Sequence, residues 1–228
     1  MSTTLIDQMF EAGAHYGYSK TRRHPSTAPF IFGTKNKADI INLEHTALQL
    51  EKAMEFAKTL GKEKKTLLFV GVKAEARKAS QDAADSIEMP YVIERWIGGA
   101  ISNWSEIKRR IAKLEDLREK KEKGELDKYT KKERLLIDRE IERLSKYFGG
   151  LTGLKKAPDA VFIVDAKREH IALTEIQKGG IPVIALANTD TNIRGIEFPI
   201  IGNDASVASI SFFTNKIVEA YNAGKMSI

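Results

Sequence analysis

Five short runs of apolar residues stand out along the chain, each with the length of a buried strand. They are Thr66–Gly71, Pro90–Ile93, Ala160–Asp165, Ile181–Leu186 and Phe198–Gly202. Continuous apolar runs are typical of strands covered on both faces, as in parallel sheets. Helix-like segments separate them, at roughly residues 45–60, 74–87, 168–178 and 204–222. This alternation predicts an α/β fold with a doubly wound parallel sheet and right-handed crossovers.

The segment 103–147 does not follow that alternation of strands and helices. Apolar residues recur every three or four positions, first at Trp104, Ile107, Ile111 and Leu114, and later at Ile137, Ile141, Leu144 and Phe148. The pattern predicts an inserted antiparallel helical hairpin, a coiled-coil arm. Gly124 suits the end of its first helix, and Thr130 with Glu133 forms a capping box for its second. We therefore expect an α/β body of residues 1–102 and 148–228 with an arm of residues 103–147.

Composition narrows the classes of protein to consider. Of 228 residues, 37 are Lys or Arg and 31 are Asp or Glu, a net charge of +6 that permits a polyanionic partner. The absence of cysteine excludes disulfides and thiolate metal sites. The N-terminus has no secretory signal pattern and no apolar run could span a membrane, so the expected location is cytoplasmic.

Signals for catalysis are weak. The chain has no GxxxxGK[ST] loop, no GxGxxG after a strand, no HExxH and no GxSxG. Gly71–Arg77 follows a strand and could offer amides to a phosphate, but an ordinary strand-to-helix turn explains it as well. Asp165 ends a strand where α/β active sites often lie, yet it could equally cap the next helix or pair with Lys167 or Arg168. His15 is a weak candidate metal ligand. We expect no enzyme, no cofactor and no small-molecule substrate.

Signals for nucleic acid are distributed over three clusters that combine cations with rings or glycines. The first is the opening stretch His15–Gly33 continued to Lys37, which we expect to stay outside any sheet. The second is Glu94–Trp104, and the third lies at the base of the arm. Cations bind phosphates, and flat side chains stack on unpaired bases. The candidate RNA-binding residues are Lys20, Arg22, Arg23, His24, Lys35, Lys37, Arg95, Trp96, Asn103, Lys108, Arg109 and Arg110.

Each cluster also has a structural explanation. Trp96 could pack in the core, the cations at the arm base could form a solvated helix face, and Arg22 or Arg23 could pair with Asp39 or Glu44. An exposed ion pair of that kind contributes only about 0–1 kcal/mol, whereas a guanidinium on phosphate makes two charge-assisted hydrogen bonds. The sequence therefore leaves the role of the two arginines to be decided by their surroundings.

Five stretches of the sequence resemble one family. In chain order, motifs of bacterial ribosomal protein S2 resemble "MFEAGAHYGYSKTRRHPSTAPFIFGTKNKADIINLEHT", "LLFVGVKAEARKA", "MPYVIERWIGGAISNW", "YFGGLTGLKKAPDAVFIVDAKREHIALTEIQKGGIPVIALANTD" and "IIGNDASVASI". The resemblance covers nearly the whole chain, and the RWxGG and GND motifs are the most specific. It implies a Rossmann-like or flavodoxin-like body with a protruding helical hairpin.

The resemblance also implies a function. The protein is then expected to be a structural component of the small ribosomal subunit that binds small-subunit (16S) rRNA and supports assembly and translation. Its expected protein partners are neighbouring small-subunit proteins, including the large mRNA-capturing protein. Three places depart from the family motifs: Tyr18 replaces a histidine, which weakens any metal role there, His24 replaces the asparagine before Pro25, and Asn188 begins a changed turn.

Two other functions predict different behaviour. A phosphate- or nucleotide-binding α/β enzyme using the carboxyl ends of the strands predicts saturable binding of a small nucleotide. A protein adaptor that works through the arm predicts salt-insensitive binding to a protein and none to rRNA.

Overall fold

Five parallel strands form the central sheet of the structure, a computed structural model that describes residues 4–227. Their spatial order is β5-β4-β6-β7-β8. Their bounds are β4 (Leu67–Val70), β5 (Tyr91–Val92), β6 (Ala160–Val164), β7 (Val183–Ala187) and β8 (Phe198–Ile201). Each strand lies within or next to one of the five apolar runs. The predicted doubly wound α/β fold is confirmed.

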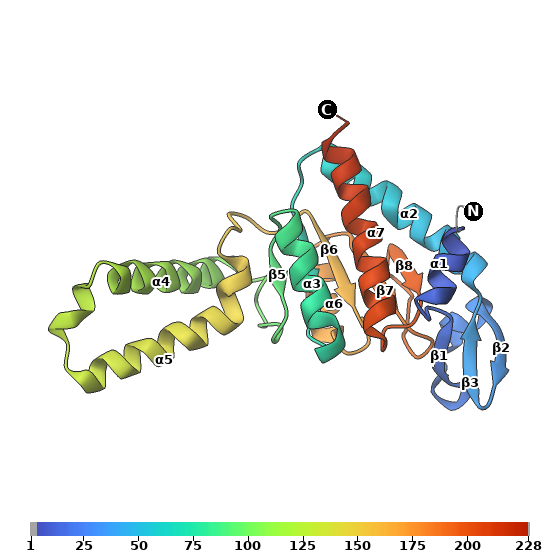
Figure 1. Ribbon diagram of the computed structural model, residues 1–228, viewed down its shortest axis with the longest axis horizontal. Coiled ribbons are helices and arrows are strands. Elements are labelled where there is room, and N and C mark those ends of the chain that lie inside the picture. Colours follow the sequence, from blue (N-terminus) through green and yellow to red (C-terminus); the bar gives the residue numbers. More distant parts are fainter. Residues whose placement is uncertain (1–3, 228) are drawn as a thin grey trace.

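Both faces of this sheet are covered, because successive strand residues point to opposite sides. In β4, Leu67 and Phe69 enter one core while Leu68 and Val70 enter the other. The first core is covered by α2 (Leu43–Lys62), α3 (Ala74–Ser86) and α7 (Val207–Lys225), and the second by α6 (His170–Lys178) and the base of the arm (Figure 1). Both faces of β4, β6 and β7 are therefore buried, which is why these runs are continuously apolar.

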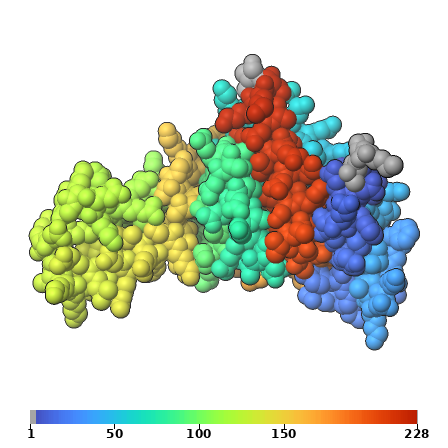
Figure 2. All heavy atoms as spheres, viewed as in Figure 1, coloured from blue at the N-terminus to red at the C-terminus, as the bar shows by residue number. Residues whose placement is uncertain are grey.

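The arm consists of α4 (Trp104–Glu122) and α5 (Lys131–Phe148), and it projects from the β5 side of the body (Figure 1). The turn η3 (Glu125–Lys128) follows Gly124, whose φ of 70° lies in the left-handed region that favours glycine. Thr130 and Glu133 form the predicted capping box. At the base, Leu114 and Leu144 are buried in the second core, so this half of the arm shares its packing with the body. Figure 2 shows that the distal half stands clear of it.

The N-terminal segment forms a second sheet, so the expectation that residues 15–33 stay outside any sheet is wrong. After α1 (Leu5–Glu11), strands β1 (Tyr16–Ser19), β2 (Ile31–Lys35) and β3 (Ala38–Ile41) pair antiparallel in the order β1-β3-β2. The 3₁₀ turns η1 (Lys20–Arg22) and η2 (Pro25–Phe30) separate β1 from β2. Register shifts interrupt both strand pairs. These irregularities break the alternation of apolar and polar residues that would otherwise have indicated strands.

The turn η4 (Gly149–Leu151) returns the chain from α5 to the body, next to β5. Among residues 4–227, none of the helices has the length and apolar character needed to cross a lipid bilayer.

Candidate nucleic-acid interface

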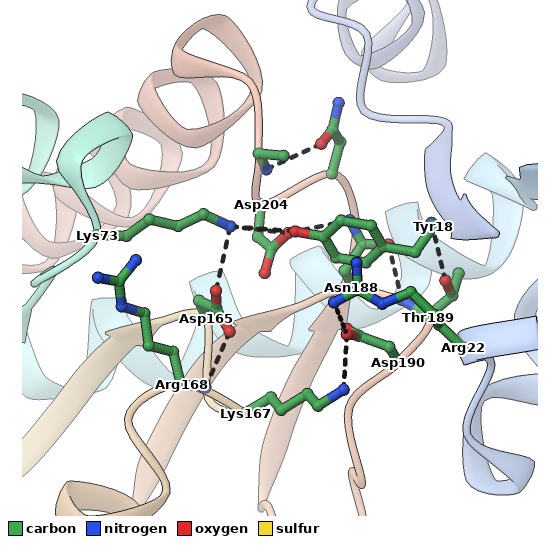
Figure 3. A network of polar contacts seen from close by, with 12 residues as sticks. Tyr18, Arg22, Lys73, Asp165, Lys167, Arg168, Asn188, Thr189, Asp190 and Asp204 are labelled. Carbon is green, nitrogen blue, oxygen red and sulfur yellow. Dashed lines mark hydrogen bonds and ion pairs between the residues drawn. The ribbon is translucent and has the colours of Figure 1, made fainter.

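The N-terminal sheet is joined to the body by a network of polar side chains at the carboxyl ends of the parallel strands (Figure 3). Lys73 follows β4, Asp165 follows β6 and Asp204 follows β8. The Lys73 ammonium lies 3.1 Å from an Asp165 oxygen and 3.5 Å from an Asp204 oxygen, and it donates to the Tyr18 hydroxyl at 3.3 Å. Since these strand ends meet at one edge of the sheet, residues distant in sequence converge there.

Lys73 keeps its positive charge in the folded protein. Burial favours the neutral amine, but the charges of Asp204 and Asp165 outweigh it and raise the pKa of Lys73. Burial and the nearby Asp165 charge raise the pKa of Asp204 to about 6, although Lys73 and a hydrogen bond from Asn188 oppose this. Tyr18 covers the strand ends where a nucleotide-binding enzyme would hold its ligand. The arrangement is a clamp between the two sheets.

Arg22 and Arg23 have different surroundings. Arg23 Nε donates to Asp39 Oδ2 at 2.7 Å, and its Nη2 donates to the second oxygen of the same carboxylate. Asp39 is fully buried, and the hydrogen bonds from Arg23 lower its pKa in spite of that burial. Arg22 is exposed: its guanidinium lies over the Tyr18 ring, 4.5 Å from the ring centroid, and 3.4 Å from Asp190. Arg23 therefore fills the structural role, and Arg22 is the more exposed of the two.

The two histidines of this segment also contact the protein itself. His24 Nδ1 accepts a hydrogen bond from the Ser26 amide at 3.2 Å and caps η2. His15 is buried beside Phe10 and Tyr16, with ring centroids 4.4 and 4.0 Å apart, and burial lowers the pKa of its imidazole. Within residues 4–227, no three His, Asp or Glu side chains gather as the ligands of a metal ion would. His15 is thus part of a ring stack.

That stack forms an exposed aromatic patch, which the sequence reasoning did not put among the candidate sites. Phe10, Tyr16 and Phe32 are 62%, 56% and 80% exposed. They line a cavity of about 710 Å³ beside the β2–β3 hairpin. The rings of Tyr16 and Phe32 were visible in the sequence, but Phe10 belongs to α1, an element that the pattern did not predict.

Glu175 of α6 organises the loop that carries the RWIGG sequence. Its carboxylate accepts hydrogen bonds from the Trp96 indole at 2.9 Å, from the amides of Gly99, Ile101 and Ser102 at 2.9–3.1 Å, and from the Ser102 hydroxyl at 2.9 Å. Burial opposes ionisation, but these hydrogen bonds outweigh it and lower the pKa of Glu175 to about 2.

Trp96 is consequently an internal residue. It is 6% exposed and packs in the second core, so its ring offers no free face to a base in this conformation. The expectation of direct RNA contact does not fit this burial. The tryptophan supports the loop instead, which was the structural alternative.

The remaining candidates divide between the two ends of the molecule. Lys20, Arg22, Lys35 and Lys37 are exposed on the N-terminal sheet, where the Lys20 amide bonds to the Lys37 carbonyl at 3.0 Å. Exposed residues at the arm base are Arg95, Asn103, Lys108, Arg109 and Arg110. The central sheet separates these two ends (Figure 1), so the structure does not bring the predicted clusters into one site.

The cations also differ in their partners. Arg109 and Arg110 both contact Glu106. Of the predicted RNA-binding cations, by contrast, five are exposed and form no ion pair within residues 4–227: Lys20, Lys35, Lys37, Arg95 and Lys108. Such side chains are available to an external anion.

Comparisons with known proteins agree on one family. A family model described as ribosomal protein S2 matches residues 9–224. The small ribosomal subunit protein uS2 of Dictyoglomus thermophilum is 42% identical over 225 residues, 99% of this chain and 92% of that protein. The uS2 proteins of Pseudoalteromonas translucida and Baumannia cicadellinicola are 38% and 40% identical, over 99% and 98% of this chain and 93% and 97% of their own lengths.

Proposed function

The chain belongs to the ribosomal protein S2 family, and we propose that it binds small-subunit rRNA through both ends of its body, as part of a cytoplasmic ribosome. The family is structural rather than enzymatic, and the chain has a structural role in the small ribosomal subunit. Through these contacts it supports assembly of the subunit and translation.

One observation carries this proposal: the predicted RNA-binding cations that are exposed and form no ion pair within residues 4–227 lie at the two ends of the body. Three lysines of the distal arm, by contrast, are paired with carboxylates: Lys120 with Asp116, Lys121 with Asp138 and Lys123 with Glu119. A cation that already has an anion gains less from a phosphate than an unpaired one. The predicted RNA-binding cations that form no ion pair therefore mark the surfaces on which rRNA phosphates would be neutralised.

Salt dependence of binding to a small-subunit rRNA transcript tests the proposal. If about five phosphates are neutralised, affinity falls about 500-fold between roughly 50 and 200 mM monovalent salt, since each phosphate adds about 0.9 to the log–log slope. The triple variant Lys20→Gln, Lys35→Gln, Lys37→Gln should lower that slope by about 2.7.

The arm offers a control of equal charge. Lys120→Gln, Lys121→Gln, Lys123→Gln removes three exposed lysines that pair with acids of the arm. This variant should keep nearly the whole slope. A flat salt profile for the native protein, or equal slopes for the two variants, would contradict the proposal.

The aromatic patch of Phe10, Tyr16 and Phe32 supports a second role. Exposed rings beside a cavity are typical of protein–protein contact surfaces. We propose that this patch docks the large mRNA-capturing protein. Tyr16→Ala with Phe32→Ala should reduce retention of that protein on purified small subunits without changing the amount of the variant in the subunits. Retention equal to that of the native protein would exclude the patch as its docking surface.

A further inference from the structure

A small cavity lies in the angle between the arm and the body. It has a volume of about 270 Å³ and is walled by Ile97 and Gly98 of the RWIGG loop, Ile107 of α4, and Leu144, Tyr147 and Phe148 of α5. Its walls are mainly aliphatic and aromatic. Sites for drug-sized molecules span about 300–1,000 Å³, so this cavity suits a single flat ring better than a whole cofactor.

Two arginines from opposite helices stand at this cavity. Arg110 Nε lies 3.0 Å from a Glu106 oxygen, and Arg143 Nη2 lies 2.7 Å from a Glu140 oxygen. Because a guanidinium has five N–H donors, each arginine keeps donors that these contacts do not use. Both side chains are exposed. Residues 103–113 and 140–148 together carry six Lys or Arg and three Glu, an excess of three positive charges around the cavity.

The loop that forms one wall is held in place. The Glu175 carboxylate accepts a hydrogen bond from the amide of Gly99, the residue next to Gly98, at 3.1 Å. Gly98 lines the cavity and has room for a larger side chain: a Cβ built at this position meets no atom within 4 Å, and its backbone is not in the left-handed region. A fixed wall means that a ligand does not have to order the loop on binding.

We propose that this cavity receives one unpaired nucleobase of RNA, with Arg110 and Arg143 on the flanking phosphates. A base supplies the flat apolar ring that the walls accommodate, and its backbone supplies phosphates for the guanidinium donors that Glu106 and Glu140 leave unused. An aromatic side chain of a protein would fill the cavity but leave the excess positive charge without a partner. This inference rests on the proposed rRNA binding. It adds a contact with one RNA base at the surface where the arm joins the body.

A pair of synthetic RNA strands tests this inference. One is a nine-nucleotide strand that is abasic except for a central 2-aminopurine, and the other is abasic throughout. The native chain should bind the first about 10-fold more tightly, since stacking of one base on aromatic side chains contributes roughly 5- to 150-fold. The 2-aminopurine fluorescence should be quenched on binding, as the base stacks on Tyr147, which is only partly buried.

Filling the cavity should abolish the preference. Gly98→Leu places a side chain in the open space, so it should bind both strands with the affinity that the native chain has for the abasic strand. Gly153→Leu is the matched control, because a Cβ at Gly153 also meets no atom within 4 Å and Gly153 does not line the cavity. This control should keep the 10-fold preference.

The outcomes separate the two proposals. Equal binding of both strands by the native chain, or an undiminished preference in a folded Gly98→Leu variant, overturns the base site and leaves rRNA binding intact. If Gly98→Leu does not fold, the native chain decides: unquenched 2-aminopurine in the bound strand also overturns the site. Failure of the native chain to bind either strand or the rRNA transcript overturns both proposals.

Discussion

Two adjacent arginines in this protein have opposite roles because of one buried carboxylate. The guanidinium of Arg23 donates hydrogen bonds to both carboxylate oxygens of Asp39, which has no contact with solvent. Arg22 is held mainly by the face of Tyr18 and by a longer contact with Asp190. From the sequence, Asp39 was one of several acidic residues that could pair with either arginine. Which pair forms depends on the β2–β3 pairing that brings Asp39 and Thr34 together.

Single substitutions should separate these roles. Arg23→Ala leaves the Asp39 charge buried without its partner, and breaking a buried pair costs about 3–5 kcal/mol of unfolding free energy. Thr34 still donates to Asp39, so a value near 3 kcal/mol is expected, a fall in Tm of about 6–12 °C for a chain of this size. Arg22→Ala should lower Tm by less than about 3 °C. Thermal unfolding followed by circular dichroism measures both, and equal shifts would contradict the assignment.

Glu175 predicts a pH dependence at one loop. Its pKa is about 2 in the folded protein against 4.5 as the ordinary value, so between these values the unfolded chain binds the proton more readily. The stabilisation is complete above about pH 4.5 and is lost as the pH falls toward 2. The NMR amide signals of Gly99, Ile101 and Ser102 should shift over this range.

Glu175→Gln is the control for that titration. It keeps the shape of the side chain but replaces one acceptor oxygen by an NH₂ group that faces N–H donors. These three amide signals should then be displaced at pH 7 and should not titrate between pH 4.5 and 2. A titration that persists in Glu175→Gln would assign it to another carboxylate. Nothing in the local sequence singled out Glu175, because its partners lie 73–79 positions away.

At the scale of elements, the parts that could be predicted are those whose burial is uniform. The strands of the parallel sheet are apolar at every position, and apolar residues recur every three or four positions in the arm helices. Both patterns can therefore be recognised in the sequence. The N-terminal sheet could not be recognised, since its strands have four or five residues, register shifts and one largely solvated face.

The arm should behave as two parts. Ile111, Leu114 and Leu144 are buried with the body, whereas Leu135 and Leu136 of the distal half are exposed. Replacing residues 118–139 by a short Gly/Ser link should therefore leave a cooperative unfolding transition with Tm within a few degrees of the native value. Replacing residues 108–146 removes three large buried side chains at about 2–5 kcal/mol each and should lower Tm strongly. Equal Tm for the two deletions would show that the base contributes no core.

At the scale of the whole molecule, the Lys73 clamp is one of the contacts that hold the N-terminal sheet on the body. It joins the carboxyl ends of the parallel strands to Tyr18 in β1, and Arg22 and Lys167 extend it through Asp190 (Figure 3). The cations proposed to bind rRNA at this end are carried by that sheet. Their position relative to the arm base therefore depends on contacts between residues far apart in the sequence.

Removing the ammonium should loosen this junction. Lys73→Met leaves Asp165 and Asp204 facing each other without a cation, so the free energy of unfolding should fall by about 3–5 kcal/mol. Adding Asp204→Asn removes one of the two like charges and should recover part of that loss, whereas Asp204→Asn alone leaves Lys73 paired with Asp165.

Limited trypsin digestion provides the local readout: cleavage at Lys20 and Arg22 should accelerate in Lys73→Met more than cleavage at the exposed distal-arm lysines. A uniform increase at all sites would mean that Lys73 stabilises the body as a whole. Losses that simply add in the double variant would show that Lys73 and Asp204 do not interact.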